Sequence, residues 1–116
     1  MQKIEKWRVQ ELVLVLEELS IILKRGKNTE WANVFSHYLY EAQKILESRI
    51  LQVDKLNQLI RNIKNCFHSG SSLDNPLIFE DMQQEFYVIL QEYQTVRLRL
   101  LGIIRQMEDQ LIEFIH

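Results

Sequence analysis

The sequence is poor in the residues that cross-link or interrupt a chain: it holds one cysteine, one proline and three glycines among 116 residues. A single cysteine excludes an intramolecular disulfide and is typical of a reducing compartment. The cysteine, the proline and one glycine fall together in residues 66–78. This is the one irregular stretch in a sequence whose pattern is otherwise helical, so any special chemistry is expected there.

Long apolar runs are also lacking. No stretch reaches the roughly 18 uncharged apolar residues of a membrane-spanning helix. The first residues run directly into a charged amphipathic pattern, without the apolar core and small-residue cleavage site of a secretory signal peptide. We therefore expect one soluble, cytoplasmic helical domain that covers residues 1–116 and has no membrane partner.

Positively charged residues are scarce in the C-terminal part of the chain. Residues 1–68 carry 11 Lys and Arg against 8 Asp and Glu, a net charge of +3, whereas residues 69–116 carry 3 against 8, a net charge of −5. Because phosphate binding needs a basic surface, the acidic part argues against a nucleic-acid partner. The same acidity suits the docking of a basic protein, and it also suits a solvated helix face.

Four stretches repeat apolar residues at the i, i+3, i+4, i+7 spacing of a helix face. They cover about residues 4–25, 29–47, 53–67 and 79–114. We predict an all-α protein, a four-helix antiparallel bundle with a long C-terminal helix. A short connection is expected at residues 48–52.

The first and last helices carry more apolar residues than one face can hold. In the first, four residues widen the main stripe and predict covering on more than one side: Val9, Val13, Leu14 and Ile21. In the last, a second stripe widens a heptad seam: Leu90, Leu98, Leu101, Ile104 and Leu111. Such a helix would be about 50 Å long, more than shorter helices can cover. It should bend near Gly102 or pack on another chain, which would give a homodimer.

Two signals mark the junction of the first and second helices. Gly26, next to basic residues, is expected to end the first helix with a positive φ. Asn28 or Thr29 can cap the second helix.

Arg61 and His68 are the sharpest enzymatic candidate. An arginine followed after six residues by a histidine resembles the signature of HEPN-type ribonucleases. The resemblance implies that His68 transfers a proton while Arg61 stabilises the phosphate. Seven positions advance a helix by about two turns, so both side chains can share a face. A solvated arginine and a histidine at a helix end explain the same pattern.

No other catalytic or metal-binding set is complete. Cys66, His68 and Asp74 are close in sequence but lack the second Cys/His pair of a zinc site. Glu113 and His116 have the spacing of a di-iron motif, yet no second motif accompanies them. Cys66 continues an apolar stripe and is expected to be a small core residue. We expect no metal and no cofactor.

Several segments together resemble a family of small, uncharacterised bacterial helical proteins. Members have Trp-Ala near the start of the second helix and a phenylalanine- and glycine-rich loop that ends in serine, an apolar residue and an Asn/Asp pair. Over roughly residues 12–80, the similarity rests on Gly26-x-x-x-x-Trp31-Ala32, Ile63-x-x-Cys66-Phe67 and Gly70-Ser-Ser-Leu-Asp74-Asn75-Pro-Leu77-Ile78. The family has no established activity. Proteins of this size and style often occur as immunity partners of bacterial toxins.

We therefore predict a non-catalytic, protein-binding domain that neutralises a toxin, with a basic toxin domain as its partner. The expected contact surface joins the loop at residues 68–78 to the first turns of the last helix. Its partner-binding residues would be His68, Asp74, Asn75, Glu80, Asp81 and Glu85. The alternatives are a HEPN-type ribonuclease that uses Arg61 and His68, and a structural bundle that self-associates.

Overall fold

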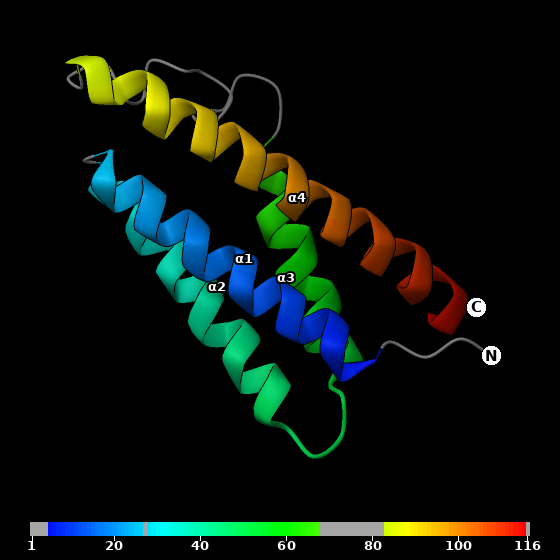
Figure 1. The fold of residues 1–116 in the computed structure, drawn as a ribbon. Coiled ribbons are helices and arrows are strands. Elements are labelled where there is room, and N and C mark those ends of the chain that lie inside the picture. The colour runs from blue at the N-terminus through cyan, green and yellow to red at the C-terminus, as the bar shows by residue number, and fades with distance from the viewer. Residues whose placement is uncertain (1–4, 27, 68–82, 116) are drawn as a thin grey trace.

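The computed structural model describes residues 5–26, 28–67 and 83–115, with the side chains of 83–87 and 112–115 left out. These residues form four α-helices and no strand (Figure 1). The helices are α1 (Lys6–Arg25), α2 (Thr29–Glu47), α3 (Val53–Asn65) and α4 (Gln83–Ile115). The all-α prediction is confirmed.

The helices alternate in direction and close into a ring (Figure 1). α1 packs along both α2 and α4, and the shorter α3 closes the ring by contacting α2 and α4. Within the described chain, the diagonal pairs α1/α3 and α2/α4 make no close backbone approach. This is the arrangement of a four-helix antiparallel bundle. None of the described helices is long and apolar enough to cross a membrane.

The core follows the predicted stripes closely. The main stripe of α1 is buried throughout: Leu12, Val15, Leu16, Leu19, Ile22 and Leu23. α3 buries its own set, which is Leu56, Leu59, Ile60 and Ile63. Fully burying one such side chain contributes roughly 1.5–3 kcal/mol, so these interlocking stripes account for the packing of the ring.

The junction of α1 and α2 shows how α1 ends at Gly26 and which of Asn28 and Thr29 caps α2. The side chain of Asn28 accepts a hydrogen bond from the backbone N–H of Trp31 at 3.3 Å, so Asn28 is the cap and Thr29 the first helical residue. Gly26 ends α1 as predicted, but its φ is −81° and not positive. Gly26 is buried and its N–H still donates to the carbonyl of Ile22, which continues the helical pattern by one residue. The connection at residues 48–52 is confirmed.

α4 continues through Gly102 as one uninterrupted helix (Figure 1). The described residues of its heptad seam are all buried within this chain: Ile89, Tyr93, Val96, Leu100, Ile103 and Met107. α1 and α3 both pack on α4. Neither a break at Gly102 nor a second chain is therefore needed to cover the seam.

The predicted covering of Leu14 and Ile21 is wrong, since these side chains are 56% and 50% exposed. Leu98, from the second stripe of α4, is 69% exposed, and its packing on another chain stays a prediction. In a ring of four helices each helix has two neighbours, and its outward side meets solvent. Val9 and Val13 are buried, as are Ile104 and Leu111 on α4.

Candidate functional site

Three large apolar side chains stand in a line on the outer side of α1. Trp7, Leu14 and Ile21 are 48%, 56% and 50% exposed. They are spaced seven residues apart, which is close to two helical turns, so they share one face of the helix. Single exposed apolar residues are normal on a protein surface, but an aligned set marks an interaction site. We call these three residues the α1 stripe.

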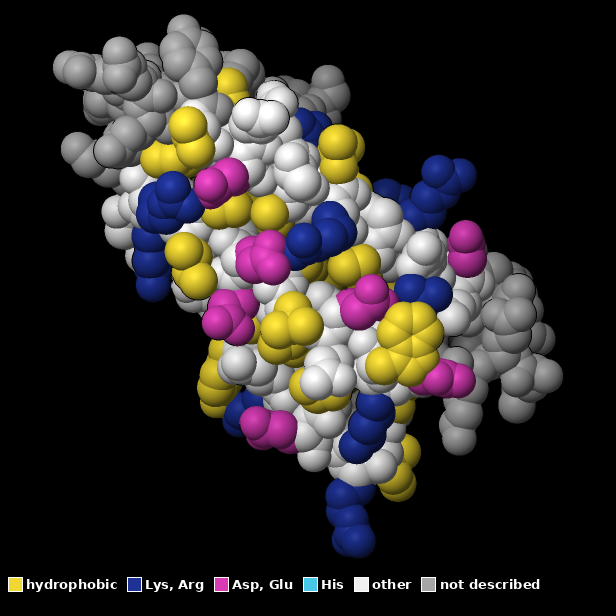
Figure 2. Space-filling model, in the orientation of Figure 1, with side chains coloured by type: hydrophobic (Ala, Val, Ile, Leu, Met, Phe, Trp, Pro, Cys, Tyr) yellow, Lys and Arg dark blue, Asp and Glu magenta, His cyan; other side chains and the backbone are white. Residues whose placement is uncertain are grey.

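An open groove of about 560 Å³ lies between α1 and α4, and Ile21 belongs to both the groove and the α1 stripe. It is lined from α1 by Glu18, Ile21, Ile22 and Arg25, and from α4 by Val88, Gln91, Glu92, Thr95, Val96 and Arg99. Val88 is itself 55% exposed. Figure 2 shows a face of the molecule on which apolar side chains alternate with acidic and basic ones. Such a mixed surface suits a protein partner better than a lipid or a nucleic acid.

Two ion pairs join the helices across the groove. Arg25 Nη1 lies 2.6 Å from Glu92 Oε2, and Arg99 Nη2 lies 2.5 Å from Glu18 Oε2. Glu18 and Arg25 are seven residues apart on α1, and Glu92 and Arg99 are seven residues apart on the antiparallel α4. Each helix therefore supplies the carboxylate of one pair and the guanidinium of the other. All four side chains are about half exposed. Each pair is therefore worth only about 0–1 kcal/mol, and its main effect is to set the charge pattern of the groove rim.

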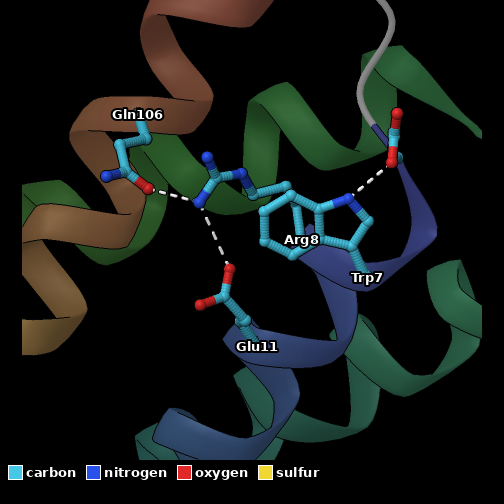
Figure 3. A network of polar contacts seen from close by, with 5 residues as sticks. Trp7, Arg8, Glu11 and Gln106 are labelled. Atoms are coloured by element: carbon cyan, nitrogen blue, oxygen red, sulfur yellow. Dashed lines mark hydrogen bonds and ion pairs between the residues drawn. The ribbon is translucent and has the colours of Figure 1, made fainter.

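The aromatic end of the α1 stripe is held by a polar network (Figure 3). The indole N–H of Trp7 donates to the carboxylate of Glu5, and the guanidinium of Arg8 lies 4.1 Å from the centroid of the Trp7 ring. Arg8 also donates to Gln106 of α4 and, at 3.3 Å, to Glu11. Cation–π and hydrogen-bond contacts therefore orient the Trp7 ring and link it to α4.

Polar residues, five of them charged, flank the α1 stripe in two rows. One row is Gln10, Glu17 and Lys24, and the other is Glu11, Glu18 and Arg25. Both rows are acidic in the middle of α1 and basic at its C-terminal end. Glu17 and Lys24 are exposed, and neither has an ion-pair partner among the described residues.

Most of the predicted partner-binding residues lie outside the part of the chain that the structure describes. These are His68, Asp74, Asn75, Glu80 and Asp81, and for Glu85 only the helical backbone is described. Arg61 is exposed on α3. Because His68 is outside the described residues, the proposed pairing of Arg61 with His68 stays a prediction.

Cys66, predicted as a small core residue, is partly buried and packs against the core from its edge. Its thiol donates to the carbonyl of Asn62 at 3.4 Å and lies 3.6 Å from the hydroxyl of Tyr38. Burial raises the pKa of the Cys66 thiol, against a smaller opposite effect of the hydrogen bond with Tyr38. Burial also raises the pKa of Tyr38, to about 12. A thiol that stays protonated is a poor nucleophile.

The described side chains include no group of three or more His, Cys, Asp or Glu placed to hold a metal ion. Glu113 and His116, the di-iron-like pair, lie outside the described side chains.

The α1 stripe is the functional candidate that sequence reasoning missed. Leu14 and Ile21 were interpreted as residues that another helix covers, and Trp7 was not considered. Their common spacing of seven residues was a usable signal. This spacing identifies an exposed surface only once the structure shows that no described helix covers the outward side of α1.

Comparison of the chain with known protein families, with curated proteins and with solved structures gave no match in any of the three. Function must therefore be inferred from the surface itself.

Proposed function

We propose that this protein is a non-catalytic helical domain that binds another protein through the α1 stripe and the adjoining groove. The partner we propose is a bacterial toxin that it neutralises in the cytoplasm. The observation that carries the proposal is the alignment of Trp7, Leu14 and Ile21 on the uncovered side of α1. Large apolar side chains aligned on one exposed helix face are the kind of anchor through which a partner helix binds.

The chemistry of the groove supports binding over bond-making. Its four charged side chains neutralise one another in pairs, Arg25 with Glu92 and Arg99 with Glu18. All four are about half exposed, whereas the reactive groups of active sites are usually buried in a cleft. Cys66, whose pKa is raised, lies on α3 and lines no part of the groove.

The charge distribution along the chain supports a basic partner. Residues 69–87 hold four acidic residues and no basic one, whereas residues 88–111 hold three of each. In sequence, the acidic stretch directly precedes the part of α4 that lines the groove. Surplus negative charge in a protein accelerates the approach of a basic partner.

Site-specific photo-crosslinking tests the surface. A photoreactive residue is placed at position 14 in one version of the protein and at position 50 in another. Ile50, 82% exposed in the connection between α2 and α3, is the matched control. The candidate partner is the product of the reading frame next to this gene. Its toxicity is measured as growth arrest, with and without co-production of this protein.

We expect co-production to relieve the growth arrest and position 14, but not position 50, to crosslink to the partner. Absence of a complex would exclude the neighbouring product as the toxin. Crosslinks from position 50 alone would place the binding surface away from the α1 stripe.

A further inference from the structure

We infer that the α1 stripe receives an amphipathic helix of the partner that runs antiparallel to α1, with an acidic first turn and basic residues along the rest. This inference rests on the proposed function and adds the class and direction of the bound segment. Its basic residues would face Glu17 and its acidic first turn would face Lys24, the two flanking charges without an ion-pair partner among the described residues.

The spacing of the stripe argues for a helix as the occupant. Trp7 and Ile21 are fourteen residues apart, so the stripe is about 21 Å long. An apolar side chain every seven residues supplies one of the two positions per heptad through which a second helix packs, and the polar residues between them restrict the contact to these three anchors. The adjoining groove provides room at the Ile21 end, where α1 and α4 leave about 560 Å³ open.

The flanking charges argue for the composition of that helix. In paired helices, the residues beside the apolar seam choose the partner and its direction. Here Glu11, Glu17 and Glu18 flank the middle of the stripe, while Lys24 and Arg25 flank its C-terminal end. Glu11, Glu18 and Arg25 are paired within the chain, with Arg8, Arg99 and Glu92, respectively. Glu17 and Lys24 are exposed without a described ion-pair partner, so both can pair with a bound helix.

The same charges argue against a second copy of this chain as the occupant. An antiparallel pair of α1 helices centred on Leu14 would place Glu11 of one copy beside Glu18 of the other, and would do so twice. A parallel pair would bring Glu17 near Glu18 of the other copy and Lys24 near Arg25. Like charges at such positions destabilise paired helices. The homodimer predicted from the sequence is therefore disfavoured on this face.

The dipole of the partner helix determines in which direction that helix lies along α1. Acidic residues are stabilising near a helix N-terminus and basic residues near its C-terminus. The acidic end of a stable partner helix is thus its N-terminal end. This end must lie against Lys24 and Arg25, which close α1. The bound helix consequently runs antiparallel to α1.

Two synthetic 21-residue peptides test this assignment. Both carry leucine at the seam positions. The matched peptide has glutamate in its first turn and lysine in the later flanking positions, and the inverted peptide exchanges these charges. The full chain carries Trp31→Phe, so that fluorescence reports Trp7 at the end of the α1 stripe. A blue shift of the Trp7 emission marks docking, and titration gives the affinity.

A charge-swapped protein supplies the control. Glu17→Lys combined with Lys24→Glu reverses the flanking charges, keeps the net charge and breaks no ion pair among the described residues. Because each peptide has the same intrinsic helicity in both titrations, a change in the ratio of affinities reports the protein surface alone.

We expect the original protein to bind the matched peptide at least tenfold more tightly than the inverted peptide. In the charge-swapped protein, the ratio of these two affinities should fall by at least tenfold. Equal ratios on both surfaces would overturn the charge assignment. Absence of any Trp7 shift with either peptide would overturn a helical occupant. Neither result would touch the proposed function, which fails only if the natural partner does not contact position 14.

Discussion

Tyr38 links α2 to the end of α3 through one polar contact. Its hydroxyl lies 3.6 Å from the sulfur of Cys66, and its ring meets Phe35 edge-on with the centroids 5.6 Å apart. Both ionisable groups are partly buried, and burial disfavours their charged forms. The pKa of Tyr38 is raised to about 12 and that of Cys66 is raised as well, so both stay neutral at pH 7.

We predict that the contribution of these two groups to the free energy of unfolding is constant from pH 7 to about pH 8 and falls at higher pH. The ordinary pKa values are 9.0 for the thiol and 10.0 for tyrosine, and both are higher in the folded chain. The unfolded state therefore loses these protons first, which favours unfolding as the pH rises through this range. The effect is at most about 1.4 kcal/mol per pH unit for each group, and partial exposure reduces it.

Urea unfolding from pH 7 to pH 11 measures this dependence. The Tyr38→Phe variant should lose stability less steeply between pH 10 and pH 11 than the unaltered chain, since it lacks the hydroxyl that ionises. Equal slopes would show that Tyr38 does not contribute.

Leu14 and Leu16 show how far a residue can be interpreted from sequence. They are the same residue type two positions apart on α1, yet Leu16 is fully buried and Leu14 is 56% exposed. Periodicity correctly placed Leu16 in the main stripe. Leu14 sits at the edge of a broad apolar arc, and its exposure depends on where the neighbouring helices lie, which local spacing does not contain.

At the scale of single elements, α4 offers the clearest test. Gly102 lies in the interior of α4, exposed, and an added Cβ would meet no atom within 4 Å. Glycine in a helix interior costs roughly 0.5–1 kcal/mol relative to alanine because it loses more backbone entropy on folding. We predict that Gly102→Ala raises the free energy of unfolding by about that amount in a urea titration. A decrease would contradict an unstrained, continuous helix at this position.

The ends of the elements were predictable where a local interaction decides them. The cap at Asn28 needs only a side-chain oxygen and the N–H of Trp31, and both are evident in the sequence. The φ of Gly26 was not predictable, because the chain enters α2 after only a short connection and Gly26 is buried there. The course of α4 past Gly102 was also left open, since it depends on how α1 and α3 share the covering of one long seam.

At the scale of the whole molecule, the ring of helices buries some apolar side chains in a core and leaves others exposed on its outer side. The inward faces of all four helices form the core, whereas the outward face of α1 keeps Trp7, Leu14 and Ile21 in solvent beside the groove. The bundle was predictable because four amphipathic stripes have few other ways to hide together. The α1 stripe was not, because only the closed ring reveals which apolar residues are left over.

The central claim is that the α1 stripe serves binding and not folding, and one double variant tests it directly. Leu14→Glu combined with Ile21→Glu is compared with Ile50→Glu for affinity toward the proposed toxin by calorimetry and for stability by urea unfolding. We predict at least tenfold weaker binding for the double variant, with a free energy of unfolding within about 0.5 kcal/mol of the unaltered chain, because exposed substitutions change stability little. Ile50→Glu should bind normally. Unchanged affinity of a folded Leu14→Glu/Ile21→Glu variant would contradict the account.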